Sequence, residues 1–342
     1  MQPIAAPLLQ WFQANKRLLP FRQEPSAYHI WVSEIMLQQT RVAAAIPYYN
    51  RFIAALPTPA DLAVCEPDAL RKLWQGLGYY NRVNNMQKAA RIVCEQYGGD
   101  LPADYDALRS LPGIGDYTAG AIASIAFGIP APAVDGNVLR VCARVLDDAT
   151  PIDSAAHKAA LTAALSACYP AGRCGDFTQA LMELGAMVCV PNGAPKCESC
   201  PLQELCLANA HGTWEKYPVK EAKKAKREEE KTVFYLTCDG CLAVRKRESK
   251  GLLAGLWELP NVEGKLDAAQ ALLFAEKAGC EPSELLKSVE RVHVFTHIIW
   301  RMRCYYIVCK EKSPEFVWAS DARRKTDVAL PTAFRMFVEE EI

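Results

Sequence analysis

The sequence predicts a multidomain protein in which a long all-α region precedes a smaller α/β domain. Its 342 residues are enough for roughly two or three domains that each bury a core. Apolar residues recur at helical spacing from the N-terminus to about residue 210. Beyond residue 231 the pattern changes to strand-like alternation, and the charge-dense segment between the two patterns predicts a linker.

The C-terminal part combines strands with a helix. Thr232–Leu236 alternates as a strand does, Asp239–Gly240 is a typical hairpin turn, and a second strand-like run, Cys241–Val244, follows. A helical pattern over Leu266–Ala278 separates this hairpin from the strand-like Tyr305–Val308. These elements predict a mixed α/β domain.

Composition excludes some classes of protein. The 39 basic and 39 acidic residues give no formal net charge, so the chain is not a generally basic polyanion binder. A local basic surface is compatible with this balance, because only the contacting surface matters. No apolar run reaches membrane-spanning length, and the N-terminus lacks the order of a signal peptide. We therefore expect a cytoplasmic protein without a membrane segment.

A short glycine turn, Leu111–Gly115, lies between two apolar helical runs and is followed by Asp135 at the expected start of another helix. Two glycines two residues apart allow a tight turn with outward N–H groups, and such a turn at a helix N-terminus can bind a phosphate. The same pattern is also common in turns without a ligand. The turn alone therefore leaves both interpretations open.

Four of the fourteen cysteines are clustered, at positions 189, 197, 200 and 206. Four thiolates on one loop suit a tetrahedral zinc or a four-iron cluster. One outlying cysteine followed by a close triple favours iron–sulfur, while a disulfide is disfavoured in the cytosol. A purely architectural metal remains an alternative. The second CxxC, at Cys238 and Cys241, flanks the expected hairpin turn, and we interpret both as strand residues.

Glu34 is an acid among apolar neighbours. On a helix it shares a face with Ile30, Leu37 and Thr40, so the carboxyl should be poorly solvated and its pKa should rise. A carboxyl that keeps its proton near neutral pH can act as a general acid. The alternative is a structural role, in which Glu34 caps a helix or forms a pair in the core.

A glycine-rich segment with adjacent aromatics, Leu73–Arg82, contains Tyr79 and Tyr80. Aromatic side chains on such a turn, beside an arginine, can stack on or wedge between nucleic-acid bases. Buried tyrosines at a helix junction are the alternative.

Together these motifs resemble the helix-hairpin-helix, or endonuclease III-like, DNA glycosylases, and within them the adenine DNA glycosylases of the MutY type. The matching segments are Leu111–Gly115 (the hairpin), Val134–Val138 (the catalytic aspartate), Ser33–Thr40 (the acid helix), Gly76–Tyr80 (the DNA-inserting loop), Cys189–Cys206 (the iron–sulfur loop), and Gly251–Pro260 with Val294–His297 (a Nudix-like domain). The spacing from Cys189 to Cys197 is one residue longer than in the family.

The resemblance implies a domain plan. Residues 1–218 would form the catalytic region, made of a six-helix barrel module at about 21–124 and a cluster module from 1–20 and 125–218. Residues 219–231 would be the linker, and 232–342 a Nudix-like domain that recognises 8-oxoguanine.

The resemblance also implies an activity: excision of adenine mispaired with 8-oxoguanine or guanine in duplex DNA, after the base is flipped out. Glu34 would protonate adenine at N7, and ionised Asp135 would stabilise the oxocarbenium-like sugar, with Asn137 and Tyr117 orienting the two acids. The implied DNA contacts are Arg22, Gln38, Gln39, Thr40, Tyr79, Gly113, Gly115, Phe295, Thr296 and His297. One [4Fe-4S] cluster would be bound by Cys189, Cys197, Cys200 and Cys206. We expect a monomer that associates with the nucleoid through DNA.

Position 117 predicts the reaction type. Bifunctional relatives such as endonuclease III have a lysine there, which attacks the sugar, whereas this chain has Tyr117. We therefore expect a monofunctional glycosylase, and an endonuclease III-like pyrimidine glycosylase/lyase is the alternative. A nucleotide pyrophosphatase is disfavoured, because the helical run 264–282 lacks a cluster of glutamates for magnesium. A non-catalytic DNA-damage binding protein is the third possibility.

Overall fold

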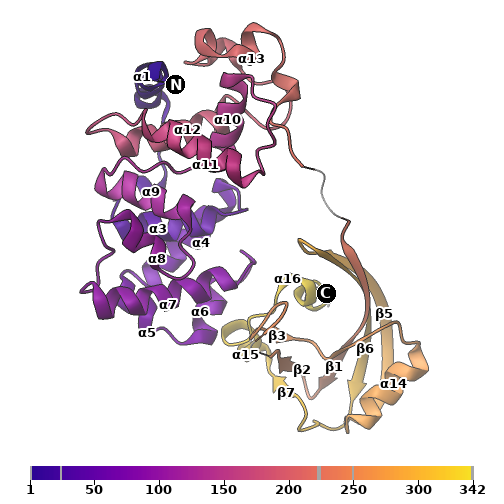
Figure 1. Ribbon diagram of the computed structural model, residues 1–342. Coiled ribbons are helices and arrows are strands. Elements are labelled where there is room, and N and C mark those ends of the chain that lie inside the picture. The colour runs from indigo at the N-terminus through magenta and orange to yellow at the C-terminus, as the bar shows by residue number, and fades with distance from the viewer. Residues whose placement is uncertain (1, 24, 222–224, 249, 340–342) are drawn as a thin grey trace. The chain divides into compact units, whose positions relative to one another are not determined.

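The computed structural model describes residues 2–23, 25–221, 225–248 and 250–339 (Figure 1). The chain divides into two compact units, one of residues 1–64 with 85–222 and one of residues 65–84 with 223–342. Within the described ranges no helix is long and apolar enough to cross a membrane.

The described part of the first unit contains helices and turns, as the sequence predicted. Its described α-helices are α1 (Ala5–Asn15), α2 (Pro20–Gln23), α3 (Ala27–Leu37), α4 (Val42–Ala55), α5 (Pro59–Val64), α7 (Asn81–Gln96, which begins before the unit boundary), α8 (Tyr105–Ser110), α9 (Asp116–Phe127), α10 (Gly136–Leu146), α11 (Ala155–Ser166), α12 (Cys174–Met187) and α13 (Leu207–Ala210). Short 3-10 helices are η1 (Gln2–Ile4), η2 (Cys197–Ser199), η3 (Gln203–Leu205) and η4 (Trp214–Lys216).

Helix α3 carries Glu34 and is buried along most of its length. The Ser26 side chain caps it by accepting a hydrogen bond from the His29 amide at 3.1 Å. The helix ends at Leu37, so Thr40 lies beyond it in a turn. Gln39, at φ +62°, occupies the left-handed backbone region in that turn, which few residues other than glycine adopt readily.

The predicted glycine turn joins α8 to α9 as a helix–hairpin–helix. Gly113 has φ +80°, and a Cβ placed on it would lie 2.8 Å from Cβ of Asn85. Both facts require glycine at this position. Gly115 is the N-cap of α9, with open space around the position of a Cβ.

Helix α10 begins immediately after Asp135 and lies in a core shared with α1 and α12. Val138 and Val141 on α10 pack in the same cluster as Phe12 on α1 and Phe177 on α12. Gly185 on α12 permits the close approach to α10, because a Cβ there would lie 2.6 Å from Cβ of Asn137. This packing fixes the position of Asp135.

The second unit has one seven-stranded mixed sheet of order β3-β2-β1-β6-β5, with β4 paired to β1 and β7 paired to β2. Strands β1 and β6 are parallel and the other pairs are antiparallel. The strands are β1 (Arg227–Cys238), β2 (Cys241–Lys246), β3 (Trp257–Glu258), β4 (Asn261–Glu263), β5 (Pro282–Val294), β6 (Ile298–Cys309) and β7 (Val317–Ala319). The helices are α6 (Pro67–Leu73), α14 (Ala268–Lys277), α15 (Asp321–Thr326) and α16 (Thr332–Val338).

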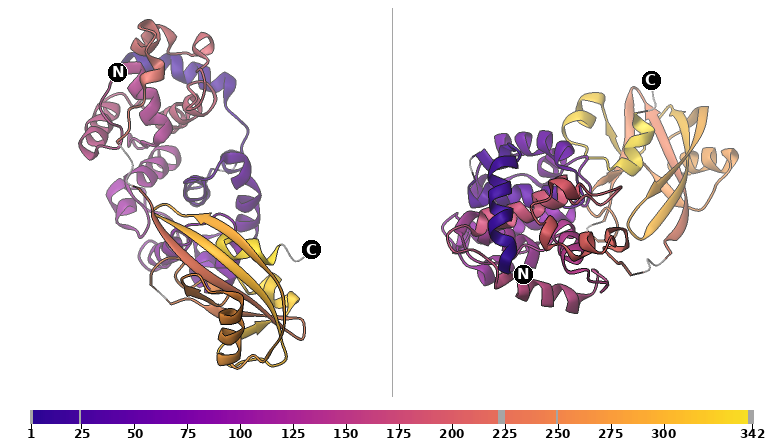
Figure 2. Two further views of the ribbon diagram at one scale, coloured as in Figure 1. Left: turned by 90° about the vertical axis from the view of Figure 1, so that its right-hand side faces the viewer. Right: turned by 90° about the horizontal axis from the view of Figure 1, so that it is seen from above.

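Alternation along β1 gives the sheet two apolar faces. Phe234 packs in a core with Ala271 of α14, whereas Val233 packs in another core with Phe334 of α16. Figure 1 shows α14 and α16 on opposite faces, and Figure 2 shows the long pair β5 and β6 twisting together. The predicted hairpin, with Cys238 opposite Cys241, is confirmed, as are the helix at 266–278 and the strand at 305–308.

Two boundaries differ from the predicted plan. Strand β1 already begins at Arg227, because the segment 227–237 pairs with β6 along its whole length, so the end of the predicted linker is strand. Residues 222–224 of that linker lie outside the described residues. The segment 65–84 groups with the second unit, where Lys72 Nζ donates to the Arg324 carbonyl at 3.0 Å.

Candidate active site

Glu34 is buried in the wall of a pocket in the first unit, with only 7% of its surface exposed. The hydroxyl of Tyr117, on α9, donates a short hydrogen bond to Glu34 Oε2. Burial raises the pKa of Glu34 to about 7, with the Tyr117 bond opposing and the charge of Asp135 adding to the rise. The rise predicted from the apolar neighbours is therefore confirmed.

Asp135 faces the same pocket from the N-terminus of α10. Its Oδ1 accepts from the Val138 amide at 2.8 Å and its Oδ2 from Asn137 Nδ2 at 2.7 Å. Burial raises the pKa of Asp135, and these two hydrogen bonds oppose the rise because they favour the ionised carboxylate. The two bonds also fix the orientation of the carboxylate.

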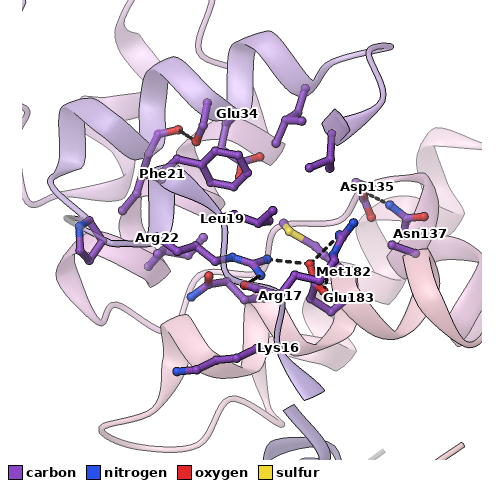
Figure 3. Close-up of a pocket in the computed structure, with 18 of the residues that line it drawn as sticks. Lys16, Arg17, Leu19, Phe21, Arg22, Glu34, Asp135, Asn137, Met182 and Glu183 are labelled. Carbon is purple, nitrogen blue, oxygen red and sulfur yellow. Dashed lines mark hydrogen bonds and ion pairs between the residues drawn. The ribbon is translucent and has the colours of Figure 1, made fainter. Parts of the chain in front are cut away.

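The pocket has a volume of about 870 Å³ and its lining includes all four predicted catalytic side chains. Figure 3 shows Glu34 and Asp135 reaching it from separate segments, and the apolar Leu19, Phe21 and Met182 also line it. A space of this size is within the range of small-molecule sites. Its lining combines apolar and charged side chains, and Glu34 and Asp135 reach it from different elements.

A third acid in this pocket, Glu183 on α12, was not predicted from the sequence. Arg17 holds it through Nε and Nη2 at 2.8 and 2.7 Å, and Arg22 Nη2 donates to the same carboxylate at 2.9 Å (Figure 3). Burial would raise the pKa of Glu183, but the two arginines together lower it. No local pattern identifies this site, because its partners lie 166 and 161 residues away in the chain.

Several predicted DNA contacts lie on exposed turns of the first unit. Gly113, Gly115 and Gln39 are exposed, and Arg22 and Thr40 line the pocket. Gln38 is half-buried, and its Nε2 lies 3.4 Å from Thr118 Oγ1, so it faces the protein.

In the second unit, the two tyrosines of the glycine-rich loop differ. Tyr80 is 7% exposed, as expected for a core residue, whereas Tyr79 is 51% exposed and has φ +48°. The Tyr79 hydroxyl lies 2.9 Å from Thr296 Oγ1. Thr296 and His297 form the exposed turn between β5 and β6, and Phe295 packs edge-on against the Trp300 ring at 4.8 Å. The structure thus places Tyr79 next to Thr296, another of the predicted DNA contacts.

The four clustered cysteines line one small cavity beside α10 and α12. All four are half-buried free thiols, and burial raises the pKa of Cys200 to about 11. In the described part of the chain, no group of three or more potential ligands is close enough to hold a metal ion.

Two arginines of α10 contact this loop, and one of them, Arg140, also connects it to the pocket. Arg140 Nη2 donates to Asn137 Oδ1 at 2.9 Å, and its Nε donates to the Cys189 carbonyl at 2.8 Å. Asn137 in turn donates to Asp135, so a continuous chain of hydrogen bonds runs from Asp135 to the first cysteine. Arg144 donates through Nη1 to Cys189 Sγ at 3.3 Å. Neither arginine was among the residues predicted from the sequence.

The Nudix-like sheet carries no glutamate cluster on α14. Glu276 is its one acidic residue, and Ala271 and Ala275 are buried against the sheet. A pyrophosphatase site would need several carboxylates at this helix to hold magnesium. Cys238 and Cys241 are strand residues on either side of the β1–β2 turn, as interpreted from the sequence.

Two family models match the chain. One describes HhH-GPD superfamily base excision DNA repair proteins and matches residues 32–161, and the other describes a NUDIX domain and matches 232–340. The chain also resembles solved structures of a thermostable thymine-DNA glycosylase (TM-score 0.56, 29% identity, covering 61% of this chain and 96% of that chain) and of endonuclease III in a non-covalent DNA complex (0.52, 25%, 62% and 97%). Fold and site define a base-excision DNA glycosylase, an enzyme that hydrolyses N-glycosyl bonds.

Comparison with curated relatives identifies the family within this class of glycosylases. The chain is 36% identical to the adenine DNA glycosylase of Homo sapiens, over 95% of this chain and 70% of that protein. It is 34% identical to that of Rattus norvegicus (97% and 77%) and 32% identical to that of Buchnera aphidicola (85% and 83%). The chain belongs to the adenine DNA glycosylase family.

Proposed function

We propose that this enzyme is a monofunctional glycosylase that removes adenine paired with 8-oxoguanine or guanine in duplex DNA. One observation carries the proposal: a single pocket contains a carboxyl with a pKa near 7, Glu34, and a second, hydrogen-bonded carboxyl, Asp135. Cleavage of a glycosidic bond needs one proton donor and one group that stabilises positive charge on the sugar.

Glu34 is the proton donor in this mechanism. At neutral pH a substantial fraction of it is protonated, so it can protonate N7 of an extruded adenine and make the base a leaving group. Tyr117 orients the carboxyl through its hydrogen bond and offers no amine that could attack the sugar. Water then adds to C1′ of the sugar and gives up a proton, so the products are free adenine and an abasic site, without a covalent enzyme–sugar imine.

Asp135 stabilises the sugar. The Val138 amide and Asn137 hold its carboxylate in one orientation and favour its ionised form. A fixed negative charge beside the developing oxocarbenium ion lowers the barrier without reorganisation at the moment of reaction. Ionised Asp135 also favours the protonated form of Glu34, since each carboxyl raises the cost of ionising the other.

Glu183 supplies an acceptor for the base. An ionised carboxylate has about four acceptor positions, and Arg17 and Arg22 occupy three of those on Glu183. The remaining position on Oε2 can accept from the N6 amino group, which distinguishes adenine from guanine, whose oxygen at the equivalent position is an acceptor.

Exposed turns supply the contacts to DNA. The amides of Gly113 and Gly115, at the N-terminus of α9, would bind a backbone phosphate, and Gln39 and Tyr79 would fill the space that the flipped base leaves. Phe295, Thr296 and His297, next to Tyr79, would read the oxidised base. Arg22, Gln38 and Thr40 would line the base's path, and the half-buried position of Gln38 makes its contact indirect.

We further propose that Cys189, Cys197, Cys200 and Cys206 bind one [4Fe-4S] cluster. Among the described residues, the cavity that they share is lined by four thiols and by no carboxylate or histidine. The buried cations Arg140 and Arg144 contact the first cysteine. Both features suit an anionic iron–thiolate centre. Such a cluster would supply a cross-link that holds the loop in shape. We also propose that the enzyme acts as a cytoplasmic, nucleoid-associated monomer on duplex DNA, with the domain order given above and a linker that ends before Arg227.

The decisive experiment compares duplexes that contain adenine opposite 8-oxoguanine, guanine or thymine and measures release of free adenine in a single turnover. We expect release from the first two and little from the thymine pair. Equal release from all three would contradict the mispair specificity. Borohydride treatment should trap little enzyme on DNA, and efficient trapping, or release of a pyrimidine, would favour an endonuclease III-like lyase instead.

A further inference from the structure

Arg144 contacts both ends of the cysteine loop. Its guanidinium is buried, with the residue 4% exposed, at the C-terminal end of α10. Nη1 donates to Cys189 Sγ at 3.3 Å and to the Val190 carbonyl at 3.0 Å, whereas Nε donates to the carbonyls of Trp214 and Tyr217, both at 3.2 Å. One side chain thus joins the start of the loop to the segment that follows it.

The backbone of Arg144 reaches the last cysteine as well. Cys206 Sγ lies 3.4 Å from the Arg144 carbonyl oxygen. The guanidinium also lies over the Trp214 ring, 5.9 Å from its centroid. A single residue of the helix that begins at Asp135 therefore contacts the first and the fourth of the proposed ligands.

Among the described residues, the charge of Arg144 has no anionic partner while the loop holds four thiols. Each hydrogen bond described for its guanidinium ends on a neutral carbonyl or on Cys189 Sγ. A buried cation is costly unless an opposite charge accompanies it. Cys189 provides that charge once it becomes a metal-bound thiolate. N–H···S contacts and local charge are also what tune the potential of such centres.

We propose that Arg144 retains the metal centre of the cysteine loop and raises its reduction potential. It does so by binding the first cysteine and the backbone on the far side of the last one. A positive charge beside a thiolate stabilises the reduced, more negative centre more than the oxidised one, so the potential rises. This inference rests on the proposed cluster and is independent of the proposed base specificity.

The test compares Arg144→Gln, Arg144→Lys and wild type, with Arg51→Gln on α4 as a matched arginine replacement at an exposed site. Iron and acid-labile sulfide per chain, the rate of bleaching by a chelator and the reduction potential are measured, with circular dichroism to verify folding. We expect Arg144→Gln to lose iron about tenfold faster, the lower end for residues that support metal ligands, and to have a lower potential. Arg51→Gln should match wild type.

The lysine variant separates charge from geometry. Lysine keeps the charge but cannot reach the sulfur and the distant carbonyls together, so its potential should stay near that of wild type while iron loss is faster. Folded Arg144→Gln with wild-type iron retention and potential would overturn the proposal. If that variant does not fold, wild-type iron retention in Arg144→Lys would overturn it. Wild-type enzyme without iron or sulfide would remove the cluster itself, while adenine release from the same sample tests the glycosylase separately.

Discussion

Two walls of the same pocket hold glutamates with opposite behaviour. Glu34 on α3 is 7% exposed and Glu183 on α12 is 1% exposed, so burial alone would raise the pKa of both. The pKa of Glu34 does rise, to about 7, whereas that of Glu183 falls. The difference lies in their partners: a neutral tyrosine hydroxyl for Glu34, and two guanidinium groups for Glu183.

The comparison shows how one pocket can both donate a proton and accept a hydrogen bond. A carboxyl that is partly protonated near neutral pH can act as an acid, and an ionised one can only accept. Placed on facing walls, the two can address different edges of one base. Breaking either arrangement should therefore affect the enzyme in a different way.

Replacing the acid gives the largest expected effect. Glu34→Gln keeps the shape of the side chain but cannot transfer a proton, so adenine release in a single turnover should fall about 10³-fold. Affinity for the mispaired duplex should change little, because the amide still fits the pocket. A variant that retains its rate would show that another group protonates the base, and a DNA-damage binding protein would show no loss of function at all.

The Glu34→Gln variant should also change how the free energy of unfolding depends on pH. Glu34 binds its proton more tightly when folded than its ordinary pKa of 4.5 allows, so the unfolded state loses the proton first as pH rises. Wild-type stability from this group is complete below about pH 4.5 and is lost as pH rises through about 7. Relative to wild type, Glu34→Gln should gain up to about 3 kcal/mol in the free energy of unfolding between pH 4 and pH 8. Urea titration measures this difference. If the variant and wild type differ in the free energy of unfolding by the same amount at pH 4 and pH 8, the pKa of Glu34 is not raised.

Replacing Glu183, the ionised glutamate, should lower the free energy of unfolding at neutral pH, whereas replacing Glu34 should raise it. Glu183→Gln leaves Arg17 and Arg22 without their counter-charge, so the free energy of unfolding should fall by about 2 kcal/mol at neutral pH. This value is below that of a fully buried pair, because Arg17 is 35% exposed and Arg22 18% exposed. Denaturant titration measures it, with Glu215→Gln on the surface as control. An unchanged stability would mean that the arginines are adequately solvated.

The same contrast explains what the sequence could predict. The burial of Glu34 follows from Ile30 and Leu37, which are one turn away on the same helix, and the hairpin follows from Gly113 and its neighbours. Glu183 was not found because its electrostatic partner Arg17 is 166 residues distant, and that contact depends on how α1 and α12 pack. Local patterns predict elements and the apolar surroundings of a side chain, whereas charge partners from distant segments depend on the tertiary fold.

Other differences between prediction and structure have the same origin. The charged residues at 227–231 were predicted to be a linker, but they form strand because β6 provides a parallel partner far along the chain. Strand β5 was not predicted at all, since most of its residues are exposed and its pairing with β6 provides the order. The orientation of Gln38 toward Thr118, on a neighbouring helix, likewise depends on packing between distant segments.

The smallest effect is expected from replacing Tyr117, the hydrogen-bond partner of Glu34. The hydroxyl of Tyr117 favours the ionised form of Glu34, so Tyr117→Phe should raise the pKa of Glu34 further. For wild type, the rate of adenine release should fall as pH rises through about 7, since the acid loses its proton there. In Tyr117→Phe this decline should move to higher pH, which a single-turnover pH profile measures. Tyr169→Phe, which loses a hydroxyl bonded to Thr178 instead, should leave the decline in place. A decline that moves to lower pH in Tyr117→Phe would mean that the tyrosine stabilises the protonated form of Glu34. The raised pKa of Glu34 would then be due in part to Tyr117 and not to burial alone.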